Sequence, residues 1–369
     1  MNHSENKAVR EPFVRIAKRN SIYWTKAVMI RVLAIIAALV VDALIIYFVT
    51  KLNPIKVYVT MFEGAFGTKR RVWITLREIM MLLCIAVGLA PAFKMRFWNV
   101  GAEGQILVGG IATAACMIYL NSLPTPLLLL VMFIASALAG AIWGLIPAIF
   151  KAKWDTNETL FTLMMNYVAI QLTSFMVALW ENPFGSNSVG VINQSTQAGW
   201  FPKLFGQTYM LNVILVMALT IGMFYYLKLS KQGYEIAVVG ESRNTARYAG
   251  INVGRVIIRT MILSGALCGL TGFLIVGGRD QTISTGTAGG NGFTAIIVAW
   301  LAKFNTFTMA LISFLLIFLE KGAAEIASAY NLNDFASDII AGIILFCILG
   351  SEFFINYRVV LRGHHKEVR

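Results

Sequence analysis

The residues best placed to do chemistry lie in one short segment, Asn99-Val100-Gly101-Ala102-Glu103-Gly104-Gln105. It supplies a carboxylate, two amides and two glycines directly before the apolar run 106–120. An ionised carboxylate at membrane depth is costly without a partner or a task, and backbone left unpaired by glycine is tolerated there only where protein or trapped water satisfies it. The segment therefore predicts the wall of a cavity inside a membrane.

A second informative segment is the loop 230–256. Within it, Ser242 can cap a short helix at its N-terminus, and Gly250 can end that helix in the left-handed conformation, which leaves about seven helical residues between them. Arg243 and Arg247 stand at i and i+4, so we expect their shared face to point away from the membrane. A rigid basic helix of this kind fits docking into a cleft on another protein, and it equally fits an ordinary solvated loop helix.

The elements that position these groups follow from composition. With 58% hydrophobic and 13% charged residues over 369 positions, the chain could not hide its apolar surface in a soluble core, so we expect an all-α polytopic membrane protein. Windows of about 20 residues predict about ten transmembrane helices, at 29–50, 76–93, 99–120, 126–150, 159–180, 209–229, 256–277, 286–302, 307–328 and 336–357. The transmembrane domain is then 29–357, between a basic N-terminal segment 1–28 and a basic tail 358–369.

The charge distribution predicts the orientation. A net charge of +13 raises the possibility of nucleic acid binding, but the charges flank apolar segments, which favours membrane lipids as the neighbours. If the N-terminus is cytoplasmic, inside segments hold 22 Lys and Arg residues and outside loops hold seven. Both termini are therefore expected in the cytoplasm. Within residues 1–28, the mixed apolar and basic stretch at 12–19 fits either a short helix on the membrane surface or a disordered tail.

Other chemistries find no support in the sequence. Four cysteines, Cys84, Cys116, Cys268 and Cys347, fall inside predicted spans without paired spacing, so neither a disulfide framework nor a metal site is indicated. The three histidines lie in the polar tails, and the sequence contains no G-x-x-x-x-G-K-[ST] phosphate-binding loop. We expect no catalytic residue, no metal and no ATP hydrolysis by this chain alone.

Four stretches together resemble permease subunits of bacterial ABC importers: Asn99 to Gln105, Thr162-Leu163-Met164-Met165-Asn166-Tyr167, Gly240 to Asn252, and Gly292-Phe293-Thr294-Ala295-Ile296-Ile297-Val298-Ala299. The resemblance is to the ribose and branched-chain amino acid type, and within it to nucleoside importers that work with basic-membrane-protein lipoproteins. It covers about residues 30 to 357 and implies a type II-like importer permease in a bacterial cell membrane. The stretch Trp300-Leu301-Ala302-Lys303 departs from the commoner family pattern, which leaves the packing of the eighth span open.

The resemblance also implies partners. They are a second, homologous permease that completes a heterodimer, a cytosolic ATP-binding subunit and an extracellular substrate-binding lipoprotein. This chain would bind no cofactor, because ATP and magnesium belong to the cytosolic subunit. By position, the helix that couples to this subunit would contain Glu241, Arg243, Asn244, Ala246, Arg247 and Gly250.

Polar residues within the predicted spans are candidates for the solute pathway. They are Asn99, Glu103, Gln105, Asn166, Tyr167, Asn291 and Phe293. Their amide, carboxylate and aromatic groups suit a nucleoside, because a base has a π-face to stack and edges to hydrogen-bond, while ribose presents hydroxyls. For any single residue, interhelical hydrogen bonding that holds the bundle together is the favoured alternative.

The glycines suggest an internal repeat. Glycine-interrupted starts occur at the third span (Gly101, Gly104) and at the eighth (Gly286 to Gly292), five spans apart. An odd offset makes the two spans enter from opposite faces, as broken helices of inverted repeats do, so spans 2–5 and 7–10 are read as related halves. Chance is a serious rival because membrane helices are rich in glycine.

The hypothesis is therefore nucleoside import by alternating access, powered from outside the chain. A simple-sugar or branched-chain amino acid importer is the alternative within the same class. An ion-coupled secondary carrier and a non-transporting membrane scaffold are the alternatives from other classes.

Overall fold

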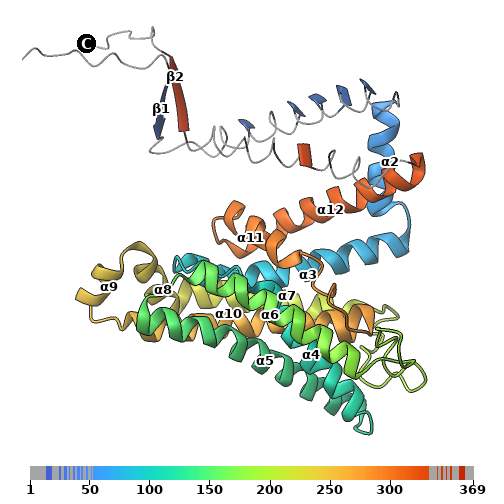
Figure 1. Ribbon diagram of the computed structural model, residues 1–369. Coiled ribbons are helices and arrows are strands. Elements are labelled where there is room, and N and C mark those ends of the chain that lie inside the picture. The colour runs from blue at the N-terminus through green and yellow to red at the C-terminus, as the bar shows by residue number, and fades with distance from the viewer. Residues whose placement is uncertain are drawn as a thin grey trace, which may run out of the picture. The chain divides into compact units, whose positions relative to one another are not determined.

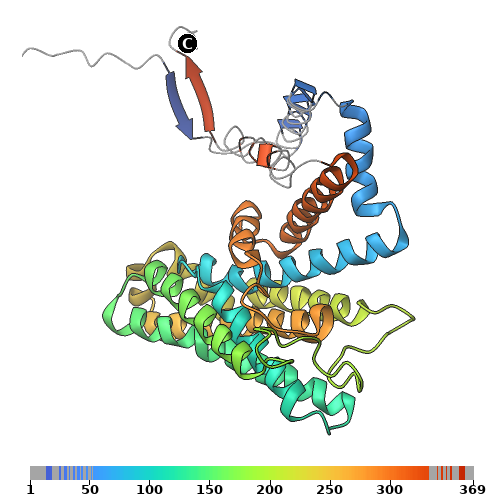
Figure 2. The ribbon, with the colours of Figure 1, turned by 45° about the vertical axis from the view of Figure 1, so that its right-hand side comes forward.

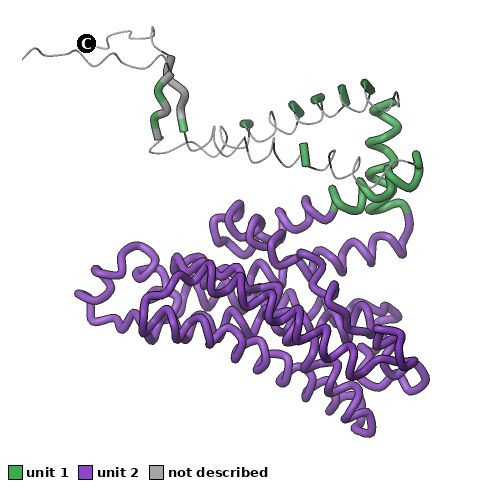
Figure 3. Tube along the Cα trace, viewed as in Figure 1, with its two compact units in different colours: residues 1–67, 318–369 green, residues 68–317 purple. Residues whose placement is uncertain are grey.

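The computed structural model describes residues 53–331 without a gap, the segments 14–18 and 357–361, and scattered helical positions between 25 and 51 and between 339 and 350. It divides into two compact units, residues 1–67 with 318–369, and residues 68–317 (Figure 3). The first and tenth predicted spans, 29–50 and 336–357, fall largely outside the described residues. Every residue proposed above for a site lies in the second unit.

The first unit contains helix α2 (Pro54–Phe66) and a two-stranded antiparallel ribbon of β1 (Val14–Lys18) and β2 (Tyr357–Leu361). Asn53 starts α2 by accepting a 2.9 Å hydrogen bond from the backbone N–H of Ile55. The sequence predicted a surface helix or a disordered tail at 12–19, and strand β1 shows that this expectation was wrong. α2 is shorter than a membrane span, and β1 pairs with a segment near the other end of the chain, so local windows reveal neither.

The second unit is a helical bundle (Figure 1). Its elements are α3 (Lys69–Lys94), α4 (Ala102–Tyr119), α5 (Thr125–Trp154), α6 (Glu158–Leu179), α7 (Met210–Leu229), α8 (Lys231–Glu241), α9 (Arg243–Tyr248), α10 (Val253–Ile275), the π-helical turn η1 (Val276–Asp280), α11 (Asn291–Leu301) and the first part of α12 (Thr306–Tyr330). Seven of the described helices, one of which is α10 extended by η1, are long and apolar enough to cross a membrane, and α11 is a shorter apolar helix. The chain is therefore a multi-pass membrane protein of helical fold, as predicted.

Helix α10 forms the centre of this bundle, where it packs against α3, α4 and α5. In its most apolar 18-residue stretch, 83% is buried, compared with 28% in the corresponding stretch of α5. Small residues permit the contact, because Gly265 and Gly269 of α10 face Gly140 and Gly144 of α5. A Cβ added at Gly269 would stand 2.9 Å from the Cα of Gly140. Close backbone approach at such small residues is the usual way that membrane helices associate, since apolar burial drives little association in lipid.

The two ends of the bundle differ. Figures 1 and 2 show α8 and α9 together at one end and the long α6–α7 connection, residues 180–209, at the other. The sites described next lie between the bundle's interior and the α8–α9 end.

Candidate translocation and coupling sites

An irregular segment, Met95 to Gly101, interrupts the path from α3 to α4. Asn99 Oδ1 accepts a 3.1 Å hydrogen bond from the N–H of Gly101. Asn166 of α6 satisfies two further backbone groups, because its Oδ1 accepts from the N–H of Gly104 at 2.9 Å and its Nδ2 donates to the carbonyl of Val100 at 2.9 Å. Backbone groups freed by the irregular turn thus find partners within the protein, as apolar surroundings require.

The amides also bind one another. Asn99 Nδ2 donates to Gln105 Oε1 at 3.3 Å and to Ser264 Oγ of α10 at 3.2 Å, while Gln105 Nε2 donates to Asn99 Oδ1 at 3.3 Å. Asn99, Gln105 and Asn166 are all at most 3% exposed. This geometry favours interhelical hydrogen bonding for these amides over direct solute contact.

Glu103 joins two broken helices. Its Oε1 accepts a 2.8 Å hydrogen bond from the N–H of Gly292 at the start of α11. A carboxylate is favourable at that position because the N-terminus of a helix carries a partial positive charge. Gly292 allows the approach, since a Cβ there would lie 2.8 Å from the backbone nitrogen of Glu103. The glycine-interrupted starts at 99–105 and 286–292 are therefore in direct contact.

The remaining pathway candidates lie elsewhere. Tyr167 is 60% exposed, because it follows buried Asn166 on α6 and neighbouring helical positions face different directions. Asn291 Nδ2 donates to the carbonyl of Ala288 at 3.0 Å. Phe293 is 45% exposed and shares one face of α11 with Ile297 and Trp300, at i, i+4 and i+7. Tyr167 and Phe293 are therefore the two exposed members of the predicted set.

Trp300 lies on this exposed face of α11 and was not among the predicted pathway candidates. Its indole stacks on Trp98 with ring centroids 5.1 Å apart and planes 25° apart, and both side chains are 44% exposed. Trp98 comes from the irregular segment before α4, so the pair brings together residues about two hundred positions apart. The sequence signals are that Trp98 directly precedes Asn99 and that Trp300 begins the stretch that departs from the commoner family pattern.

The loop 230–256 contains the predicted short helix. Ser242 Oγ accepts a 3.2 Å hydrogen bond from the N–H of Thr245, and Gly250 has a φ of +76°. α9 therefore begins and ends with the residues predicted for its caps. The sequence did not predict α8, although Ser230, whose Oγ accepts from the N–H of Gly233 at 2.9 Å, was a usable capping signal.

α8 is fixed to the bundle beside the irregular segment. Gly240 lies against the carbonyl of Lys94 and the Cα of Met95, with no room for a side chain. Glu235 Oε2 forms a 3.0 Å ion pair with Arg259 of α10. A displacement of α8 would therefore act on the end of α3, where the path toward Glu103 begins.

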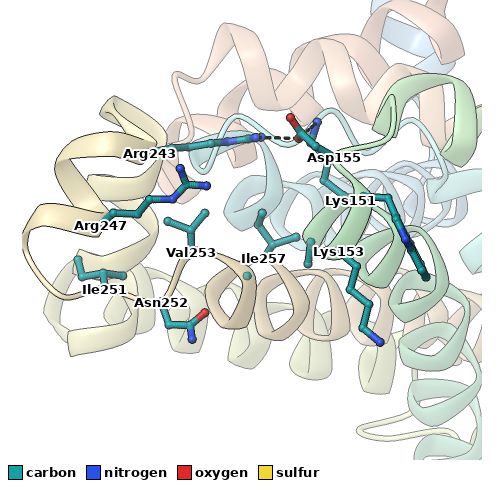
Figure 4. A pocket seen from close by; sticks show the side chains of 12 residues that line it. Lys151, Lys153, Asp155, Arg243, Arg247, Ile251, Asn252, Val253 and Ile257 are labelled. Carbon is teal, nitrogen blue, oxygen red and sulfur yellow. Dashed lines mark hydrogen bonds and ion pairs between the residues drawn. The ribbon is translucent and has the colours of Figure 1, made fainter.

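α9 has one face toward α5 and one toward solvent. Arg243 NH1 lies 3.1 Å from Asp155 Oδ1, and Lys151 Nζ lies 2.8 Å from the same oxygen (Figure 4). The hydrogen bond from Lys151 lowers the pKa of the Asp155 carboxyl below its usual range. Arg243 therefore pairs with an acidic residue that follows α5, a partner that the sequence did not predict.

A cavity of about 570 Å³ separates α9 from the end of α5, and Arg243, Arg247 and Lys153 line it (Figure 4). The coupling candidates Glu241, Asn244, Arg247 and Gly250 are exposed, whereas Ala246 is fully buried and anchors α9. Tyr248, which the sequence reasoning did not single out, is 94% exposed at the tip of the helix. An exposed aromatic ring beside exposed polar residues is typical of a protein contact surface.

The sequence is similar to those of known proteins over most of its length. A family model described as the permease component of branched-chain amino acid transport systems matches residues 72–349. A glucose ABC transporter permease protein of Haloferax volcanii is 28% identical over 89% of this chain and 88% of its own length. A guanosine ABC transporter permease protein of Bacillus subtilis and a nucleoside ABC transporter permease protein of Lactococcus lactis subsp. cremoris are each 28% identical, over 88% and 87% of this chain and 93% and 91% of their own lengths.

Proposed function

The chain belongs to the family of permease components of branched-chain amino acid transport systems, and from this premise we propose that it is the membrane subunit of an ABC importer that carries nucleosides. Two of the three relatives named above are a guanosine and a nucleoside permease, and the third is a glucose permease at the same identity. A simple sugar is therefore the alternative cargo, and the experiment below separates the two.

The stacked, exposed pair Trp98 and Trp300 is the observation that supports a nucleoside. A nucleobase presents a flat π-face, and stacking on an aromatic side chain contributes about 1–3 kcal/mol per base in single-stranded nucleic acid complexes. Phe293, two turns away on the same face of α11, offers a further ring. Glu103 acts here as a positioning residue, since it fixes the N-terminus of α11 and with it the direction of this face.

The proposed mechanism is alternating access driven through α9. A cytosolic ATP-binding subunit docks on the exposed side of α9 and moves α8, which bears on the end of α3 at Lys94. The irregular segment then transmits the displacement to α4, and the Glu103 hydrogen bond transmits it to α11. Each step is a direct contact between packed elements. Rigid movement of these helices against one another is therefore sufficient to couple α9 to α11.

The same proposal includes the other partners and the orientation. A second, homologous permease completes a heterodimer, and an extracellular lipoprotein delivers the solute. Positively charged loops favour the cytoplasm, and we therefore propose that the α8–α9 end and both termini lie inside a bacterial cell. ATP and magnesium are bound by the partner subunit, and this chain contributes movement and a solute path.

Uptake by the reconstituted complex tests the proposal. Labelled guanosine, uridine, ribose, glucose and leucine are compared in vesicles that contain the permeases, the ATP-binding subunit and the binding protein. We expect ATP-dependent uptake of the nucleosides, and loss of that uptake when Trp98 and Trp300 are both changed to Ala. Preferential uptake of glucose or leucine would contradict the nucleoside assignment and leave the importer class intact.

A second experiment tests the docking surface. Arg247→Glu reverses an exposed charge on α9 while leaving the ion pair of Arg243 with Asp155 in place. We expect lost or strongly reduced uptake at an unchanged amount of permease in the membrane, and the double change of Arg243 and Arg247 to Glu should abolish it. Lys203→Glu, in the connection at the other end of the bundle, is the matched control and should transport normally. Normal transport by the double variant would remove the docking hypothesis.

A further inference from the structure

A small basic pocket lies where three helical elements end. Lys94 at the end of α3, Lys228 near the end of α7 and Lys303 in the turn between α11 and α12 line a cavity of about 250 Å³. The other described residues that line it are Phe224, Leu227, Phe304, Asn305 and Thr306, and none of them carries a carboxylate. Three ammonium groups around one cavity suit the binding of an anion.

The polypeptide holds two of these positive groups in place. Lys94 Nζ donates a 3.2 Å hydrogen bond to the carbonyl of Leu227, and Lys228 Nζ lies 5.1 Å from the centroid of the Phe224 ring. The N-terminus of α12 adds further positive potential, because its first N–H groups have no intrahelical acceptors. Asn305 Oδ1 accepts from two of them, on Phe307 at 3.0 Å and Thr308 at 3.4 Å.

Thr306 points independently to a missing ligand. It lines the pocket and is 2% exposed, yet its hydroxyl has no hydrogen-bond partner among the residues that the structure describes. A buried hydroxyl without a partner is unfavourable in a native protein. A bound oxyanion would supply an acceptor at this wall after a small adjustment of the side chain.

An apolar surface continues from the pocket along α12. The ring of Phe224 contacts Phe307 with centroids 4.8 Å apart. Phe307, Leu311 and Phe314 follow at i, i+4 and i+7 and are 57%, 68% and 40% exposed. On a membrane-spanning helix, such a stripe is suited to contact with acyl chains. A phospholipid bound here would therefore place its headgroup against the lysines and an acyl chain along α12, which a free phosphate ion cannot do.

We propose that this pocket binds the phosphate headgroup of an anionic phospholipid, which we call the lipid site. Basic pockets between membrane helices are suited to such headgroups. The lipid would join the ends of α3 and α7 to the start of α12, and so would steady the bundle beside the contact of Lys94 with α8. The proposal does not depend on the cargo, the ATP-binding subunit or the direction of transport.

Lipid binding to the purified permease in detergent tests this proposal by native mass spectrometry. The probes are phosphatidylglycerol, phosphatidylcholine and inorganic phosphate. We expect retained phosphatidylglycerol, little phosphatidylcholine, and weaker binding of phosphatidylglycerol by about 30-fold in the double variant Lys228→Gln, Lys303→Gln, since a lysine near an anionic lipid contributes about fivefold. Lys231→Gln, an exposed lysine at the start of α8, is the matched control and should bind as the wild type does.

A second measurement needs no variant. Phosphatidylglycerol should raise the thermal unfolding midpoint of the wild-type permease, because a ligand that binds only the folded state stabilises it. Equal protection by phosphatidylcholine would overturn the proposal, and so would equal protection by inorganic phosphate, which would identify an anion site without lipid. Equal losses of binding in Lys231→Gln and the double variant would also overturn it. Failure of any of these leaves the transport function untouched, because no cargo or ATP is present.

Discussion

Glu103 offers the sharpest test of how the two broken helices are joined. Changing Glu103 to Ala removes the acceptor for the N–H group of Gly292 at the start of α11. Changing it to Gln keeps one carbonyl oxygen of similar reach and removes only the charge. The pair of variants therefore separates the hydrogen bond from the electrostatic attraction between a carboxylate and a helix N-terminus.

The expected magnitudes follow from this geometry. Hydrogen bonds to charged groups contribute about 1.5–3 kcal/mol, and a buried N–H left without a partner costs a similar amount, so Glu103→Ala should lower the free energy of unfolding by about 3 kcal/mol. Glu103→Gln retains a neutral hydrogen bond and should cost about 1 kcal/mol. At about 2.1 cal/mol/K of unfolding entropy per residue, the 369 residues convert these values into losses in unfolding temperature of about 4 °C and about 1 °C.

Buried thiols provide the assay. Cys84 and Cys268 are 2% and 0% exposed, so a thiol-reactive fluorescent dye reaches them only when the bundle opens. The unfolding midpoint is read from the rise in fluorescence on heating the detergent-solubilised permease. Glu241→Ala, which removes an exposed carboxylate at the end of α8, serves as the control and should change stability by no more than about 0.5 kcal/mol.

Two results would refute the reasoning. Unchanged unfolding in Glu103→Ala would show that the carboxylate does not hold α11. A loss in Glu103→Gln as large as in Glu103→Ala would show that the charge, and not the hydrogen bond, carries the interaction.

Three further predictions concern the packing and the short helix. Gly269→Val places side-chain atoms against Gly140, and this overpacking should lower the free energy of unfolding by about 1–3 kcal/mol or more. Gly222→Ala is the control, because a Cβ at this position of α7 meets open space, and it should be neutral or stabilising in the same thermal assay. Asn166→Ala leaves the two backbone groups that it satisfies unpaired and should cost about 1–3 kcal/mol, so a wild-type midpoint would contradict its role in holding the irregular segment. Ser242→Ala removes the N-cap of α9 and should cost that helix about 1 kcal/mol, measured as faster amide exchange over residues 243–248, and unchanged exchange would argue against the cap.

Local chemistry made part of this structure predictable. Ser242 and Gly250 act on the backbone within a few residues of themselves, so their capping roles follow from sequence alone. The long helices were predictable for the same reason, since each carries its own apolar stretch. The eighth span was predicted at 286–302, but its helix begins only at Asn291 because Gly289 and Gly290 adopt positive φ in the preceding turn.

Long-range partners were the part that the sequence could not supply. Asn166 is a plausible solute ligand in isolation, and only the fold shows that its amide is used by backbone groups more than sixty positions away. The offset of the glycine-rich starts suggested that they meet, yet nothing local identified Glu103 as the group that joins them. The partner of Arg243 was unpredictable in the same way, because Asp155 follows a helix that is distant in sequence.

The central claim is that this chain moves solute only when another subunit supplies the energy through α8 and α9. Accumulation of labelled guanosine in vesicles tests it most directly, with the permease pair alone compared with the complete complex supplied with ATP and binding protein. The account predicts concentrative uptake by the complete complex only. Accumulation by the permeases alone, driven by an imposed ion gradient, would contradict it.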